Sequence, residues 1–134
     1  MHAESRHLSV YIDRPTAEVY AFASDPANLP RWAPGLGSSM VREKQNWFVE
    51  TPAGRVQVTF APDNVYGVLD HEVVTPSGDT VYVPLRAIAD GDGCEVVFTV
   101  RRSAGMTDAE FERDIGMVTA DLALLKKVVE GATE

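Results

Sequence analysis

Alternating apolar and polar positions run through the middle of the chain. Between residues 39 and 102 the pattern is typical of successive β-strands with one buried face. A sheet of six or seven strands is about 30 Å wide, whereas a helix covers a stripe only about 10 Å across. One long helix, over residues 107–130, is available to cover these strands. We therefore expect the sheet to curl around that helix and to leave a gap lined by apolar side chains.

The segment before residue 39 predicts one strand and two short helices. Apolar and polar residues alternate over residues 8–13, which is the pattern of a half-buried strand. Pro15 suits the first turn of a helix, and an apolar face extends that helix over residues 15–24. Prolines limit a second helical segment over residues 25–34, so we expect a compact elbow that carries Trp32.

Three turn signals divide the strand region into hairpins. Residues 51–55 and 75–79 share the order Thr-Pro-small-Gly-charged, in which proline presets φ and glycine accepts a left-handed conformation. Residues 90–93 read Asp-Gly-Asp-Gly between two apolar alternations, which is a strong hairpin signal. Together the three turns predict an antiparallel meander.

The second and third turns also predict which residues face each other. Closing the second turn places His71 opposite Val83. The same register brings Leu69 opposite Leu85, and closing the third turn brings Leu85 opposite Phe98. All five residues then share one face of the sheet, which is the face expected to be buried.

The other face of these strands is polar and is interpreted as the solvent side. Its members are Asp70, Glu72, Tyr82, Arg86 and Glu95. Asp70 and Arg86 are near enough in this register for a cross-strand ion pair. As an exposed pair, it is expected to contribute little stability.

The long C-terminal helix has a clear start and one buried face. Residues 107–110 read Thr-Asp-Ala-Glu, which is a capping box. Apolar residues then recur at alternating steps of four and three, at Phe111, Ile115, Val118, Leu122, Leu125 and Val129. Gly116 interrupts the helix at a cost of about 1 kcal/mol relative to alanine. Two interpretations stay open: close packing of this glycine against a bulky strand residue, or space kept free for a ligand.

Composition narrows the range of partners. With 134 residues, 45% of them hydrophobic, the chain fits a single domain over residues 1–134. Its net charge of −8 opposes binding to nucleic acids. No segment resembles a signal peptide or a membrane span, so we expect a cytoplasmic protein with no membrane partner. The single cysteine, Cys94, cannot form an internal disulfide, which is consistent with a reducing compartment. We expect its thiol to be buried and inert.

His71 is the strongest candidate for chemistry. It lies between Leu69 and Val73 on the apolar face, where a neutral imidazole could contact a ligand or act as a general base. A core histidine with a satisfied hydrogen bond is the alternative. The neighbouring Asp70 and Glu72 point to the opposite face, so these residues are not expected to form a metal site. No cofactor is expected.

The order of these elements and three local motifs resemble a known superfamily. Residues 10–20, VYIDRPTAEVY, and 25–32, DPANLPRW, resemble the opening of START-like or SRPBCC proteins, which adopt the helix-grip fold. Residues 66–71, YGVLDH, resemble a form found in bacterial polyketide cyclase-like members. The resemblance implies an α+β fold. In that fold a curved antiparallel sheet of six to seven strands wraps around the long C-terminal helix, and two short helices follow the first strand.

The resemblance also implies a deep cavity between the sheet and the long helix. Across the superfamily such cavities hold lipids, aromatic polyketides and similar apolar molecules. In this chain we predict that the ligand contacts Trp32, Phe60, Leu69, His71, Val83, Leu85, Phe98, Phe111, Ile115 and Gly116. Whether Trp47 or Phe48 also faces the cavity stays open.

Three functions are considered on this basis. The first is binding or carriage of a small, mainly hydrophobic molecule, either a lipid or an aromatic polyketide. The second is a polyketide cyclase or dehydratase that uses His71 as a general acid or base, although Arg86 points away from the cavity and speaks against it. The third is a co-chaperone-like interaction module whose acidic outer face meets a basic partner. Exposed edge strands also allow a homodimer.

Overall fold

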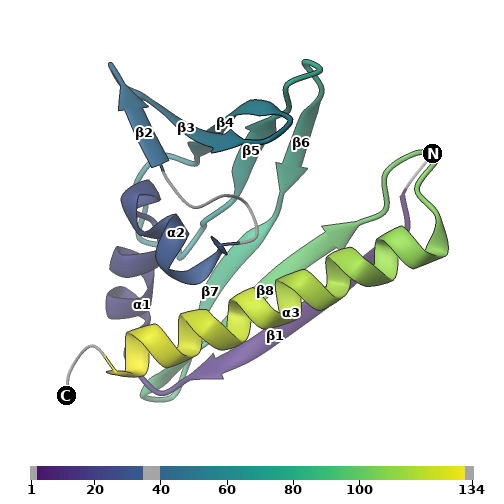
Figure 1. The fold of residues 1–134 in the computed structure, drawn as a ribbon. Helices are drawn as coiled ribbons and strands as arrows, with labels where there is room; N and C mark the ends of the chain where they lie inside the picture. The colour runs from purple at the N-terminus through teal and green to yellow at the C-terminus, as the bar shows by residue number, and fades with distance from the viewer. Residues whose placement is uncertain (1–2, 35–39, 132–134) are drawn as a thin grey trace.

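The chain folds into antiparallel strands and one long C-terminal helix, as Figure 1 shows. The computed structural model describes residues 3–34 and 40–131. In chain order the elements are β1 (Ser5–Ile12), α1 (Thr16–Ala23), the 3-10 helix η1 (Pro26–Asn28), α2 (Leu29–Trp32), β2 (Met40–Glu43), β3 (Asn46–Thr51), β4 (Gly54–Phe60), β5 (His71–Val74), β6 (Thr80–Val83), β7 (Leu85–Asp90), β8 (Gly93–Arg101) and α3 (Asp108–Gly131). This order of a strand, short helices, a meander and a long helix confirms the helix-grip prediction.

The strands form two sheets where the sequence predicted one. β1, β8 and β7 form a three-stranded sheet, and β2 to β6 form a five-stranded sheet in chain order. Pro84 separates β6 from β7, and a proline has no N–H to donate to a ladder. Backbone hydrogen bonds from Leu69 N to Leu85 O and from Ala87 N to Gly67 O still join the segment before β5 to β7. The meander therefore bends at Pro84 and continues from the five-stranded sheet into the three-stranded sheet.

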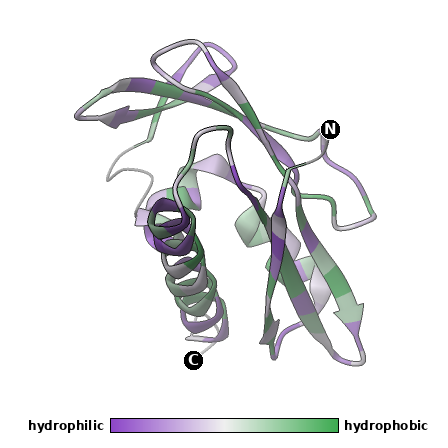
Figure 2. Ribbon diagram, turned by 90° about the vertical axis from the view of Figure 1, so that its right-hand side faces the viewer, coloured by the Kyte–Doolittle hydropathy of each residue, from purple (hydrophilic) through white to green (hydrophobic). Residues whose placement is uncertain are grey.

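The predicted register is confirmed in both hairpins. His71 lies opposite Val83 in the pairing of β5 with β6. Leu85 lies opposite Phe98 in the pairing of β7 with β8. The predicted hairpin at the first turn is also present, with Thr51 paired to Gly54. Figure 2 shows the resulting alternation of hydrophilic and hydrophobic positions along the strands.

Helix α3 packs along the three-stranded sheet, against β1 and β8, and also contacts α2. Its capping box is present, because Thr107 N donates to Glu110 Oε1 at 2.9 Å and Glu110 N donates to Thr107 Oγ1 at 3.1 Å. The five-stranded sheet bends over one end of the helix, as Figure 2 shows. Within the described residues, no helix is long and apolar enough to cross a lipid bilayer.

The neighbours Trp47 and Phe48 point to opposite faces of β3. Trp47 lies opposite Val58, which is buried. Phe48 lies on the other face, where the guanidinium carbon of Arg55 is 5.0 Å from its ring centroid. Neither aromatic side chain lines the cavity described below. The predicted buried position of Cys94 is confirmed, and burial raises the pKa of its thiol.

Candidate functional site

A cavity of about 220 Å³ lies where the bent five-stranded sheet faces α3. Helix α2 and strand β8 complete its wall, so four parts of the chain that are distant in sequence contribute to it. Its lining consists of Leu29, Trp32, Ala33, His71, Val73, Val83, Phe98, Val100, Asp114, Met117, Val118 and Asp121. Most of these side chains are apolar, and the few polar ones come from α2, β5 and α3. This mixture is typical of a small-molecule site.

Helix α2 supplies one end wall of the cavity because its path is set by local chemistry. The carboxylate of Asp25 accepts a hydrogen bond from Ala27 N at 3.0 Å and caps the 3-10 turn. Prolines stand in the first turn of both helical segments, where no backbone donor is needed. The short elbow turns Trp32 inward, where only 1% of its surface is exposed.

The structure brings together four of the ten residues predicted for the cavity. Trp32, His71, Val83 and Phe98 all line it. The predictions of His71, Val83 and Phe98 rested on inward parity in the strands, and the register that this parity requires is present. Trp32 was predicted from the proline-bounded elbow that carries it.

Two other predicted residues, Leu69 and Leu85, are inward-facing but lie in the solid core. They are directly beside the junction of the two sheets, where the backbones are hydrogen-bonded to each other at 2.8 Å. Phe60 lies outside the cavity and stacks on His71, with ring centroids 4.8 Å apart. It therefore supports the histidine ring.

The three residues predicted from α3 lie elsewhere on the helix. Phe111 and Ile115 form a separate apolar cluster with Val100 near the start of α3. Gly116 is exposed, and a Cβ built on it would meet nothing within 4 Å. The packing interpretation of Gly116 is therefore wrong, and this glycine does not line the cavity.

Sequence reasoning missed the polar side of the α3 wall. The helix turns Asp114, Val118 and Asp121 toward the cavity. Their three- and four-residue spacing places them on one stripe, beside the apolar stripe that was recognised. The spacing was visible in the sequence, but acidic residues on a helix are normally solvated and gave no reason to place them inside.

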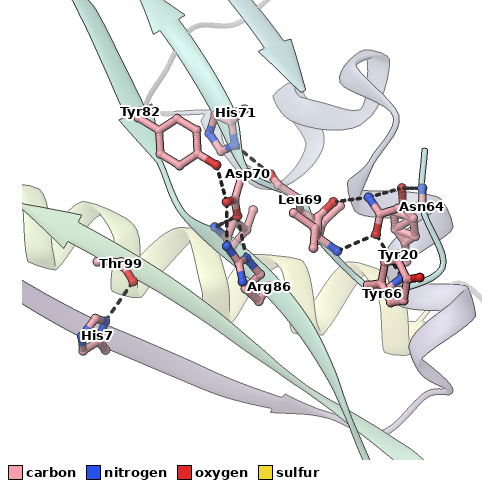
Figure 3. Close-up of polar contacts among 12 residues, drawn as sticks. His7, Tyr20, Asn64, Tyr66, Leu69, Asp70, His71, Tyr82, Arg86 and Thr99 are labelled. Atoms are coloured by element: carbon pink, nitrogen blue, oxygen red, sulfur yellow. Dashed lines mark hydrogen bonds and ion pairs between the residues drawn. The ribbon is translucent and has the colours of Figure 1, made fainter. Parts of the chain in front are cut away.

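His71 lies on the opposite wall from α3 and is held in one tautomer. Only 5% of its surface is exposed. Its Nδ1 is 3.0 Å from the carbonyl oxygen of Leu69, as Figure 3 shows, and a carbonyl can only accept. Nδ1 therefore carries the proton. Burial lowers the pKa of His71, which favours the neutral imidazole, so Nε2 keeps its lone pair. No described residue donates a hydrogen bond to this nitrogen.

The indole nitrogen of Trp32 does not add a donor to the cavity. Nε1 has almost no accessible surface and has no hydrogen-bond partner among the described residues. A buried donor without a partner costs about 1–3 kcal/mol. Trp32 therefore contributes apolar ring surface to the cavity wall.

Asp114 and Asp121 add two carboxyl groups to the wall, and the lining contains no lysine or arginine. Burial raises the pKa of Asp121 to about 6, because the charged form loses solvation. A carboxyl group near the neutral range can exchange a proton with a ligand. Within the described residues, no group of three or more histidine, cysteine or acidic side chains could hold a metal ion.

The prediction that Asp70 faces solvent is wrong, because only 3% of this residue is exposed. It lies at the junction of the two sheets, where Tyr82 and Arg86 fold over it (Figure 3). Asp70 does point to the outer face of the strand, but side chains from β6 and β7 cover it and exclude solvent. One of the three carboxylates proposed for an acidic docking face is thereby neutralised. The interaction module itself stays a prediction.

A larger groove of about 710 Å³ lies on the surface between α1, the 61–67 loop and β7. Asn64 organises the loop, because its Oδ1 accepts from both Tyr66 N and Val68 N at 3.0 Å. Its backbone N–H also donates to Tyr20 Oη at 3.0 Å, as part of the network in Figure 3. Tyr66 is 82% exposed beside this groove. No local pattern in the sequence predicted this groove.

Comparison with protein families identifies one match over nearly the whole chain. A model described as polyketide cyclase / dehydrase and lipid transport matches residues 5–130. A search of curated proteins finds no significant relative.

Solved structures show the same fold at low sequence identity. XoxI from Bacillus cereus is 12% identical, with a TM-score of 0.73, and the match covers 97% of this chain and 98% of that one. The Zhui aromatase/cyclase from Streptomyces sp. R1128 is 17% identical, with a TM-score of 0.69 and coverage of 99% and 97%. Ara h 8.0201 is 13% identical, with a TM-score of 0.66 and coverage of 95% and 97%.

Proposed function

The chain belongs to the polyketide cyclase/dehydrase and lipid transport family, and from this premise we propose that it binds a small, mainly hydrophobic molecule in the cavity between α3 and the bent sheet. The observation that carries the proposal is an apolar cavity whose lining includes the buried His71. Nδ1 of this histidine is bound to Leu69 O, and Nε2 has no donor among the described residues. A bound molecule that donates a hydrogen bond to Nε2 would remove the cost of leaving this acceptor unpaired.

The size of the cavity favours a compact ligand. At about 220 Å³ it is smaller than the roughly 300–1,000 Å³ of drug-sized ligand pockets. A molecule built on one or two rings suits this space better than a long acyl chain. Of the two ligand classes considered from the sequence, a compact aromatic molecule is therefore preferred to a lipid.

Ligand binding can be tested with the tryptophan that lines the cavity. The chain has two tryptophans, so Trp47→Phe leaves Trp32 as the single reporter. Titration of this variant with a library of one- and two-ring compounds should change its fluorescence. The same compounds should raise the melting temperature, because binding to the native state stabilises it.

Blocking the cavity provides the control for this experiment. Val83→Phe should fill part of the cavity and abolish both signals. Val81→Phe on the same strand is the matched control, because Val81 is 42% exposed and does not line the cavity. Compounds that bind the Val83→Phe variant as well as the parent would contradict the proposed site.

A second candidate function is catalysis, and the tautomer of His71 is the observation that favours it. With Nδ1–H held by Leu69 O, Nε2 keeps the lone pair that a general base needs. His71→Ala should then abolish cyclisation or dehydration of a bound substrate while binding persists. Unchanged turnover in this variant would remove the histidine mechanism and leave the binding function intact.

A further inference from the structure

The polar groups of the cavity are unbalanced in charge. Asp114 and Asp121 contribute two carboxyl groups, and His71 contributes an acceptor nitrogen. The lining contains no cationic side chain to oppose them. A ligand that binds here therefore meets mostly acceptors and negative charge.

The two cavity carboxylates also differ from other acidic residues of the same helix. Asp108 pairs with Arg102 at 2.6 Å, Glu112 pairs with Arg6 at 3.6 Å, and Glu130 pairs with Lys126 at 2.7 Å. Neither Asp114 nor Asp121 has an ion pair with any described residue. Asp121 is partly removed from solvent all the same, and removing a carboxylate from water without a partner costs free energy. A cation inside the cavity would offset this cost.

On the basis of the proposed function, we propose that the ligand is an apolar molecule with a protonated amine and that Asp121 is its counter-ion. The ammonium group would offset the lost solvation of the carboxylate and could donate a further hydrogen bond to His71 Nε2. The aromatic side chains of Trp32 and Phe98, which also line the cavity, suit an aromatic body, and aromatic rings attract a nearby cation. A ligand with a free carboxylate would instead add a like charge to a site that already holds two.

Three matched probes distinguish these cases. Benzylamine, benzyl alcohol and benzoate share one ring and differ in charge, and the corresponding 2-naphthyl compounds extend the series to two rings. Calorimetric titration at pH 7.5 should give the tightest binding for the amine, weaker binding for the alcohol and the weakest for the carboxylate. For the amine, Asp121→Asn should weaken binding about fivefold or more, while binding of the alcohol stays within about twofold.

A remote charge provides the control for Asp121→Asn. Asp92 lies exposed in the turn between β7 and β8, away from the cavity, so Asp92→Asn removes the same charge from the protein. This variant should leave the affinity for the amine unchanged. Thermal melts of both variants establish that they are folded.

The outcomes separate this inference from the proposed function. If the alcohol binds and Val83→Phe abolishes its binding, but the amine binds no tighter, the amine inference is overturned and the binding function stands. Equal losses of amine affinity in Asp121→Asn and Asp92→Asn would also overturn it, because the effect would then come from overall charge. If no probe binds at either ring size, the proposed function itself loses its support.

Discussion

The carboxylate of Asp70 accepts two parallel hydrogen bonds from the guanidinium of Arg86, with Nε–Oδ1 and Nη2–Oδ2 distances of 2.8 Å each. It also accepts from Tyr82 Oη at 2.5 Å and from Leu85 N at 2.9 Å. These donors come from β6 and β7, and Asp70 directly precedes β5. One buried carboxylate therefore joins the two sheets at their bend, next to the strand that carries His71 into the cavity.

Replacing Asp70 should destabilise the fold strongly. Asp70→Asn removes the charge to which Arg86, Tyr82 and Leu85 donate hydrogen bonds, so we expect the free energy of unfolding to fall by about 2–4 kcal/mol. Arg86 is half-exposed, which keeps the loss below that of a fully buried pair. Urea unfolding followed by circular dichroism measures the change. Asp92→Asn, an exposed control, should stay within about 0.5 kcal/mol of the parent.

Asp70 should also govern stability in acid. The bonds from Arg86, with those from Tyr82 and Leu85, hold its pKa well below the ordinary value of 3.8. Its contribution is therefore present above about pH 4 and is lost as the pH falls toward the lowered folded-state pKa. Melting temperatures recorded from pH 5 to pH 2 should fall more steeply in the parent than in Asp70→Asn. If the melting temperatures of the two proteins fall by the same amount between pH 5 and pH 2, this role of Asp70 is contradicted.

Two cavity groups should act in opposite directions between pH 7 and pH 4. The pKa of Asp121 is raised to about 6, so the folded state holds an extra proton and stability rises as the pH falls through 6 toward 4. The pKa of His71 is lowered from 6.5 by burial, so stability is lost as the pH falls below 6.5. The two effects partly cancel in the parent.

Single variants separate these two contributions. In Asp121→Asn only the contribution of His71 remains. The melting temperature of this variant should therefore drop more than that of the parent between pH 7 and pH 5. His71→Phe should show the reverse trend over the same range. Calorimetric melts at closely spaced pH values measure both. Identical pH profiles for the two variants would show that neither group titrates as the cavity predicts.

Two glycines should respond oppositely to alanine. Gly116 is exposed within α3, and the new methyl group would meet nothing within 4 Å, so Gly116→Ala should stabilise the protein by about 1 kcal/mol. Gly67 has φ +76°, and a Cβ there would approach Ala87 O to 2.0 Å. Gly67→Ala should therefore destabilise by more than about 2 kcal/mol. Thermal melts distinguish the two signs, and a loss of stability in Gly116→Ala would restore a packing role for that glycine.

The capping box predicts a further measurable loss. Thr107→Ala removes the side-chain acceptor of Glu110 N and should lower the free energy of unfolding by about 1 kcal/mol. Thr107→Ser keeps the hydroxyl and is the matched control. Denaturant midpoints for the two variants should differ by this amount if the cap holds the first turn of α3.

The amino-acid pattern alone predicted much of the fold because its signals act over short distances. The turns after Thr51, Thr75 and Asp90 each place their own flanking strands, and period-two alternation then leaves only one register that keeps His71 and Val83 on the same face. The start of α3 follows in the same way from four consecutive residues.

The cavity could be predicted only in part. Strand parity pointed to His71, Val83 and Phe98, which line the cavity, although parity could not tell a lining residue from a core residue such as Leu85. That difference depends on where the second sheet separates from α3, and no local pattern records it. Asp114 and Asp121 of α3 were not predicted to line the cavity, for the same reason.

What the sequence determined by itself was therefore the order of elements, the hairpin register and the buried stripe of the helix. The bend between the two sheets, the burial of Asp70 and the entry of Asp121 into a cavity were decided only by tertiary structure. Local patterns state which way a side chain points relative to its own backbone. Whether the side chain then contacts water, a charged partner or a cavity depends on chain segments that are distant in sequence.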